Sequence, residues 1–169
     1  YVYKRQPTAD MPSDEFIRNQ VAAYLVGDAS DRHDRLAALG FFAMGPVYYQ
    51  DNGEKAKALA DEWDDRVYTL TRWLLCLTVS CARCHDHKTD PIPTREYYRV
   101  AAALSGVRHG AQHGIFSVRS VNPGVMRIHR RGSAGDLGAE VMPGGVAALQ
   151  GGNAEFKLAI KSGDADRRR

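Results

Sequence analysis

The feature of this sequence that most constrains its fold is an apolar stripe at helical spacing. Large apolar side chains recur from Leu59 to Leu77 at steps of 4, 4, 3, 4 and 3 residues, which matches the 3.6-residue period of an α-helix. Acidic residues crowd the N-terminal half of this stretch, where they favour the helix dipole. One further step of four residues reaches Cys81. The pattern therefore predicts a long amphipathic helix that ends at this cysteine, with Cys76 buried inside it as a small apolar residue.

The remainder of the first hundred residues also has helical character. Acidic residues follow Ser13 and precede an apolar stripe, which predicts a helix that stops at Gly27. A shorter helix is expected between residues 31 and 44, where Gly-Pro ends it. A fourth helix is expected to begin at Thr94, directly after two prolines that enforce an extended turn. The sequence thus predicts a mainly α protein with several helices.

The composition changes after residue 106. Residues 115–118 and 125–128 read as short strands, with a turn at 122–124 between them. Seven glycines and little periodicity between 132 and 152 indicate a loop or linker. We expect three parts: a helical domain over residues 1–106, a connecting segment over 107–131, and a Gly-rich, partly extended linker with the truncated start of a second domain over 132–169.

Length and charge exclude several classes of protein. A chain of 169 residues with 44% apolar and 25% charged residues is typical of about one soluble globular domain. A net charge of +3, scattered among acids, does not favour nucleic acid as a partner. No apolar run approaches the roughly 20 residues that a bilayer requires, so no transmembrane segment is expected. Because the chain begins with Tyr1 and ends abruptly, we expect an internal piece of a longer protein, whose other domains are its expected partners.

Residues 81–85 carry the clearest chemical signal, since they read Cys-Ala-Arg-Cys-His. This CxxCH pattern is the attachment sequence for c-type haem. On a helix, positions i, i+3 and i+4 share one face, so two thiols and an imidazole can reach one porphyrin. In this interpretation Cys81 and Cys84 form thioethers, and His85 is the proximal iron ligand.

Other interpretations of the motif stay open at this stage. A thioredoxin-like pair favours a helix N-terminus, whereas this pair is predicted at a helix C-terminus. A zinc or iron site would recruit the two motif cysteines, His85 or His87 together with remote ligands, and an unmodified cysteine pair needs no ligand. We find no nucleophile–base set, so no enzymatic reaction is predicted. The candidates for an additional or sixth ligand are His87, Met44, His109, His113, Met126 and His129.

The sequence around the motif resembles a known family. Residues 63–67 read Trp-Asp-Asp-Arg-Val, residues 69–72 read Thr-Leu-Thr-Arg, residues 77–88 hold the motif, and residues 90–94 read Asp-Pro-Ile-Pro-Thr. Together with Gly-Phe-Phe-Ala-Met-Gly-Pro at 40–46, they resemble the planctomycete-specific cytochrome-type (PSCyt) domain of unknown function of large secreted bacterial proteins. The resemblance covers about residues 7–106. The tail from about Val125 is similar to the start of the planctomycete-specific (PSD) domain that follows it.

The resemblance implies a c-type-cytochrome-like module within an exported multidomain protein. We therefore expect a periplasmic or cell-surface protein that binds haem c and transfers electrons to an unknown redox partner. The alternative is a helical accessory domain of a secreted hydrolytic system, in which the motif binds zinc, iron or nothing.

Overall fold

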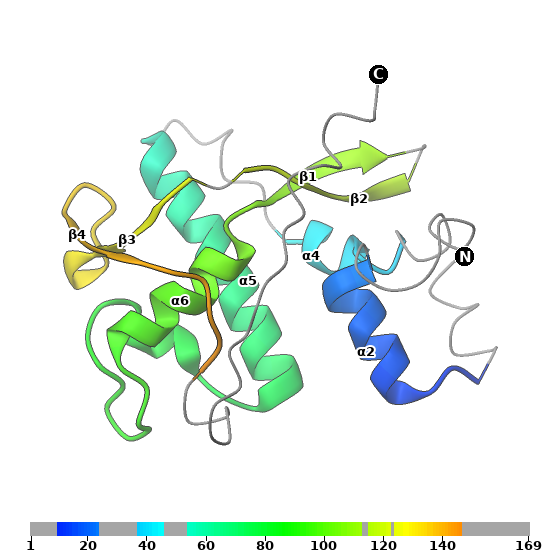
Figure 1. Ribbon diagram of the computed structural model, residues 1–169, viewed down its shortest axis with the longest axis horizontal. Coiled ribbons are helices and arrows are strands. Elements are labelled where there is room, and N and C mark those ends of the chain that lie inside the picture. The colour runs from blue at the N-terminus through cyan, green and yellow to red at the C-terminus, as the bar shows by residue number, and fades with distance from the viewer. Residues whose placement is uncertain (1–9, 24–36, 46–53, 113–114, 123, 147–169) are drawn as a thin grey trace. The chain divides into compact units, whose positions relative to one another are not determined.

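The computed structural model divides the chain into two compact units. The first consists of residues 1–45 and 107–120, and the second of residues 46–106 and 121–169. The described residues are 10–23, 37–45, 54–112, 115–122 and 124–146. Within these ranges, both units contain helices and one antiparallel two-stranded sheet (Figure 1). Helices outweigh strands, so the predicted mainly α class is confirmed. Among the described residues, no helix combines the length and apolar character needed to cross a membrane.

In the first unit, a short helix packs against both a longer helix and a pair of antiparallel strands. Helix α2 spans Ser13–Ala22, the short helix α4 spans Gly40–Ala43, and strands β1 and β2 span Val107–Gln112 and Ile115–Ser120. The strands pair with Val107 opposite Ser120. Helix α4 contacts both α2 and β2. The described core of this unit includes the buried side chains of Leu39, Phe42, Ala43 and Val118.

Helix α5, Lys55–Leu75, is the helix that the apolar stripe predicted, but it ends earlier than expected. Cys76 adopts a left-handed backbone (φ 54°, ψ 28°), and its N–H donates to the carbonyl of Thr71. This C-cap geometry stops the helix. The prediction that the CxxCH motif lies at the end of the long helix is therefore wrong, and so is the prediction of a buried Cys76, because this residue is exposed.

The motif instead lies in a separate 3₁₀ helix, η4, Val79–Arg83, and the turn that follows it. Val79 and Ala82 are fully buried and anchor this segment in the core of the second unit. Helix α6, Thr94–Leu104, then begins at the expected residue. The N–H of Thr94 donates to the Asp86 carboxylate (2.8 Å). This side chain from the motif loop satisfies one of the free donors at the start of α6.

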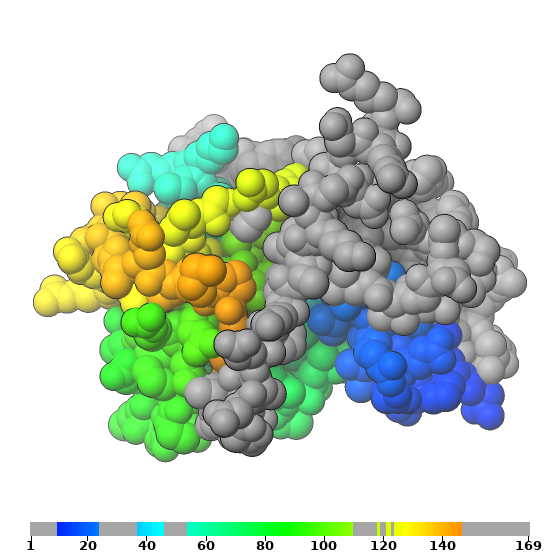
Figure 2. All heavy atoms as spheres, viewed as in Figure 1, coloured from blue at the N-terminus to red at the C-terminus, as the bar shows by residue number. Residues whose placement is uncertain are grey.

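The second unit is completed by a β-hairpin packed on α6. Strand β3, Met126–His129, pairs antiparallel with β4, Leu137–Val141, and the short turn η5, Arg130–Gly132, follows β3. Both strands contact α6. On the face shown in Figure 2, the yellow and orange atoms of this hairpin lie against the green atoms of the α6 region.

The two predicted strands exist, but each has an unexpected partner. Residues 115–118 lie in β2, which pairs with β1, and most of 125–128 lies in β3, which pairs with β4. Strand β4 falls inside the Gly-rich stretch that we expected to be a linker. Its sequence alternates too weakly to predict a strand. Its pairing places the buried Val141 opposite the buried Met126, which supplies the apolar contact that stabilises it.

Candidate functional site

The 3₁₀ helix η4 presents the two motif cysteines to solvent. The N–H of Cys81 donates to the carbonyl of Thr78 (3.0 Å), and Cys84 is the C-cap residue of η4. In a 3₁₀ helix, side chains at i and i+3 align along one side. The two thiols are therefore expected to share a face, as they would on an α-helix, and both are free and exposed.

His85 is exposed next to these thiols, and one of its ring nitrogens has a defined partner. Its Nδ1 lies 2.7 Å from the backbone carbonyl oxygen of Asp86. Since a carbonyl only accepts, Nδ1 carries the proton, and in the neutral ring the lone pair is then on Nε2. This arrangement of a histidine fixed through Nδ1–H to a carbonyl is typical of residues that bind a metal through Nε2.

His87, the second predicted ligand in this loop, has both ring nitrogens engaged. Its Nδ1 accepts the N–H of Asp90 (2.9 Å), and its Nε2 lies 2.9 Å from the hydroxyl of Thr78. The side chain is only 7% exposed. Its backbone N–H also donates to the carbonyl of Ile92 (2.9 Å). These contacts favour a structural role, in which His87 closes the loop that carries the motif.

Arg83, between the two cysteines, connects the motif to α5. Its guanidinium donates to Asp61 (2.8 Å) and lies 3.4 Å from a carboxylate oxygen of Asp64. Asp64 also accepts the hydroxyl of Tyr97 (2.9 Å). Burial opposes the charge of Arg83, but the hydrogen bond with Asp61 and the neighbouring charges outweigh it and raise the pKa of Arg83. Asp64 of α5 therefore pairs with the motif itself.

Tyr98 joins the motif to the β3–β4 hairpin. Its hydroxyl oxygen lies 3.2 Å from the carbonyl of Arg83 and 3.1 Å from the carbonyl of His129. Burial raises the pKa of Tyr98 to about 12, so the hydroxyl is a donor at neutral pH. The ring of His129 packs against Tyr98 and Trp63, with centroids 5.4 Å and 6.1 Å away. Burial and the charge of Arg83 lower the pKa of His129.

The other candidate ligands lie in different surroundings. Met44 is 71% exposed and belongs to the first unit, as does His109 in β1. Met126 is buried in β3. His113 lies outside the described residues. Within the described ranges, no three His, Cys, Asp or Glu side chains converge as a group that could hold a metal ion.

Three features of this site were not predicted from the sequence: the pairing of Arg83 with α5, the contacts of the Tyr98 hydroxyl, and the close approach of Gly132 to Cys84. A Cβ at Gly132 would lie only 2.5 Å from the Cys84 sulfur. All three contacts join residues that are distant along the chain. The only local signal was Arg-Gly next to a predicted strand, which is turn chemistry.

Comparison with known proteins places the chain in a family without a known activity. No curated protein matches significantly, and no solved structure does. The family model PSCyt2, described as protein of unknown function (DUF1549), matches residues 1–109, which include the whole CxxCH motif. Since the match spans more than half of the chain and agrees with the resemblance of the motif region, the chain belongs to the PSCyt2 family, a planctomycete cytochrome-type domain of unknown function.

Proposed function

We propose that this chain is a c-type haem-binding electron-transfer module of a larger exported protein. One observation carries the proposal: residues 81–85 present two free, exposed thiols and an exposed imidazole whose Nδ1–H is tied to a carbonyl. In this proposal Cys81 and Cys84 bind the porphyrin, and His85 binds the iron through Nε2.

The donor set of the motif fits haem better than it fits a single metal ion. A zinc or iron ion held by protein alone needs ligands that converge on one point, usually four of them. The described residues contain no convergent group of three. Haem makes a different demand, because the two sulfurs and the imidazole bind separate atoms of one wide ligand. The exposure of Cys81, Cys84 and His85 is compatible with such a ligand.

The chemistry required of the cysteines is simple. Each thiol adds across a vinyl group: its S–H bond breaks, the sulfur bonds to one vinyl carbon, and the hydrogen goes to the other. This addition needs no leaving group and no oxidant. Bound haem would supply a one-electron Fe(III)/Fe(II) couple. Because haem is attached covalently outside the cytoplasm, the proposal includes a periplasmic or cell-surface location.

The residues around the motif hold it in place from several sides. Arg83 is fixed by two carboxylates of α5, Tyr98 holds the Arg83 carbonyl, and His87 closes the loop after His85. A ligand supported in this way would keep its orientation when the bound iron changes its charge. We therefore assign these residues a supporting role and the motif residues the binding role.

The test is a pyridine haemochrome spectrum of the denatured chain, produced in a periplasm with haem-attachment machinery. We expect a c-type band that remains with the polypeptide. It should be lost when Cys81 and Cys84 are both replaced by alanine, and retained in Cys76→Ala, a matched control because Cys76 is also free and exposed but lies outside the motif. His85→Ala should keep covalent haem but change the visible spectrum of the folded protein.

Absence of the band, in cells that load a control cytochrome, would overturn the proposal. Zinc and iron contents of the purified chain would then test the non-haem alternative. Retention of covalent haem by the variant without both motif cysteines would also contradict the assignment.

A further inference from the structure

Gly132 occupies a position where no other residue fits without displacing Cys84. A Cβ at this glycine would lie 2.5 Å from the Cys84 sulfur, 3.7 Å from its Cβ and 3.8 Å from Cγ of Arg83. Sulfur and carbon do not approach that closely without overlap. The backbone of Gly132 therefore lines one side of the Cys84 thiol. Cys84 as a whole is still exposed to solvent.

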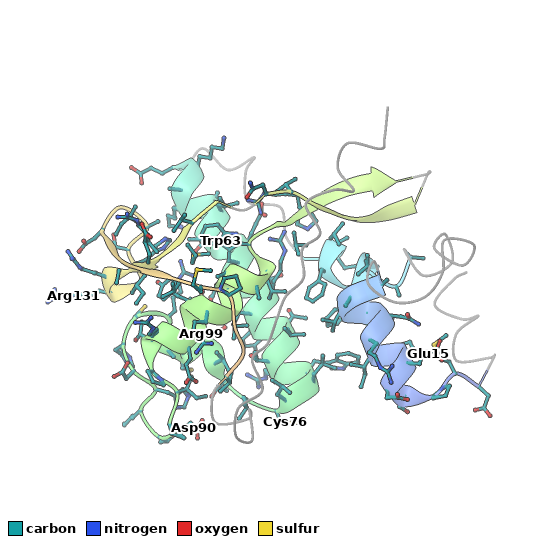
Figure 3. The ribbon with its side chains drawn as sticks, in the orientation of Figure 1. Glu15, Trp63, Cys76, Asp90, Arg99 and Arg131 are labelled. Carbon is teal, nitrogen blue, oxygen red and sulfur yellow. The ribbon has the colours of Figure 1, made fainter. Side chains whose placement is uncertain are left out.

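The local backbone also requires glycine here. Arg131 and Gly132 both have left-handed φ angles, 52° and 74°, and the N–H of Ser133 donates to the carbonyl of Arg130 (3.0 Å). Two consecutive residues with positive φ, enclosed by a hydrogen bond between the residues on either side of them, are typical of a tight turn that favours glycine. Because Arg131 has a Cβ, its left-handed conformation costs about 1 kcal/mol. Figure 3 shows Arg131 at the outer end of the hairpin, with its side chain directed outward.

Further contacts fix this turn within the hairpin and connect the hairpin to the motif. The N–H of Arg130 donates to the carbonyl of Asp136 (2.8 Å), and their side chains pair at 3.2 Å. Before the turn, the carbonyl of His129 accepts from Tyr98, whose hydroxyl also contacts the carbonyl of Arg83. The Tyr98 hydroxyl thus contacts both the hairpin, at His129, and the CxxCH segment, at the residue before Cys84.

We propose that Gly132 is a positioning residue for Cys84: its bare backbone holds the sulfur on one side and leaves the opposite side for the ligand. The turn at residues 130–132 is then part of the thiol site, although it lies beyond the region that the family model matches. The role of Gly132 toward haem rests on the proposed function, whereas its contact with the Cys84 sulfur is independent of haem binding.

Thiol reactivity of the native, haem-free full chain tests the contact directly. The chain is treated briefly with iodoacetamide, denatured and digested with trypsin, and the modified peptides are quantified. Cleavage after Arg83 separates Cys84 from a peptide that holds the other two cysteines, which serve as an internal reference. In Gly132→Ala the sulfur is displaced from its packed side, so we expect Cys84 to react several-fold faster relative to this reference. An unchanged ratio, or a parallel increase at all cysteines, would overturn the proposal.

Two glycines of the same unit provide matched controls. Gly124 also has a left-handed φ (71°), but a Cβ there would meet nothing within 4 Å. Gly124→Ala therefore introduces the same backbone strain without the contact. Gly135→Ala introduces neither, since its surroundings are open and no positive φ is present. Neither substitution should change the reactivity ratio of Cys84; a change as large as that in Gly132→Ala would contradict a specific contact.

A rescue experiment covers the case in which Gly132→Ala does not fold. Replacement of Cys84 by alanine removes the sulfur, and the added methyl group then meets the Cβ of residue 84 at an ordinary 3.7 Å. We expect Gly132→Ala to lower the thermal midpoint clearly less in the Cys84→Ala background than in the parent chain. Equal losses in both backgrounds, or failure of both to fold, would show that the sulfur is not the obstacle and would overturn the proposal.

Haem loading distinguishes this proposal from the proposed function. In chains produced with haem-attachment machinery, Gly132→Ala should lower the fraction with two thioether bonds and leave haem joined through Cys81 alone. Unaltered double attachment would exclude a role toward haem. If the parent chain carries no haem, the proposed function fails, while the alkylation ratio still decides whether Gly132 positions Cys84.

Discussion

The ion pairs of Arg83 should be the main link between the CxxCH segment and α5, and their strength can be worked out from the structure. The Arg83 side chain is 18% exposed, and those of Asp61 and Asp64 are 24% and 30% exposed. Hydrogen bonds to charged groups contribute about 1.5–3 kcal/mol, whereas fully exposed pairs contribute about 0–1 kcal/mol. The partly buried geometry lies between these cases. We therefore expect Arg83→Met to lower the free energy of unfolding by about 2 kcal/mol.

Urea unfolding followed by tryptophan fluorescence is a suitable assay, because Trp63 and Trp73 both lie on α5 and report on the second unit. A double-mutant cycle of Arg83→Met with Asp61→Asn isolates the pair, with an expected coupling of about 1–2 kcal/mol. Lys57→Met is the matched control. Lys57 contacts the same carboxylate at 3.0 Å but is 71% exposed, so its loss should cost at most about 0.5 kcal/mol.

The pH dependence gives the same prediction an independent check. Burial opposes the charge of Asp61, but hydrogen bonds from Arg83 and Lys57 outweigh it and lower its pKa from 3.8. A carboxylate with a lowered pKa stabilises the fold above its unfolded pKa and loses this effect as the pH falls through the folded value. The difference between the parent chain and Arg83→Met should therefore be full near neutral pH and shrink below about pH 4. A coupling below about 0.5 kcal/mol at neutral pH, no larger than a surface pair, would refute the reasoning.

Three further substitutions test other parts of the second unit. Cys76→Gly should raise the free energy of unfolding by about 0.5–1 kcal/mol in the same urea titration, since glycine adopts the left-handed C-cap without strain; a loss of stability would contradict this. The pKa of His129 is lowered in the folded chain, so the unfolded chain binds a proton first and the free energy of unfolding falls as the pH drops below about 6.5. His129→Phe should make this fall less steep. An unchanged slope of stability against pH would show that His129 does not cause the fall. Tyr98→Phe should cost about 1–2 kcal/mol, as two carbonyls lose their shared donor, and a loss below about 0.5 kcal/mol would show that water replaces the hydroxyl.

The sequence predicted those features that depend on neighbouring residues. The apolar stripe identified α5 from a period that any amphipathic helix must show, and the two prolines predicted the start of α6 at Thr94. The CxxCH pattern singled out Cys81, Cys84 and His85 by spacing alone, and all three are exposed in the structure. It also predicted that the cysteines share a face, a condition that either an α-helix or a 3₁₀ helix meets.

The features that the sequence did not predict depend on contacts between distant segments or on a residue with weak local preference. The end of α5 at Leu75 was missed because the left-handed C-cap is a cysteine rather than the usual glycine. The pairing of β4 with β3 was missed because its glycine-containing sequence becomes a strand only against Met126 and α6. The burial of Arg66, which pairs with Glu62 one turn earlier on α5 (3.1 Å), was missed for a different reason: charged residues are normally solvated.

The early end of α5 changes how the CxxCH segment must be held. A motif on the last turn of a long helix would inherit its geometry from helical hydrogen bonds. The motif in the short 3₁₀ helix η4 has few such bonds of its own, so its geometry depends on the buried Ala82, the ion pairs of Arg83 and the hydroxyl of Tyr98. The last of these also contacts the hairpin that carries Gly132. The stretch that identifies the family therefore contains the residues to which we assign haem binding, and the hairpin that follows it contacts the same segment.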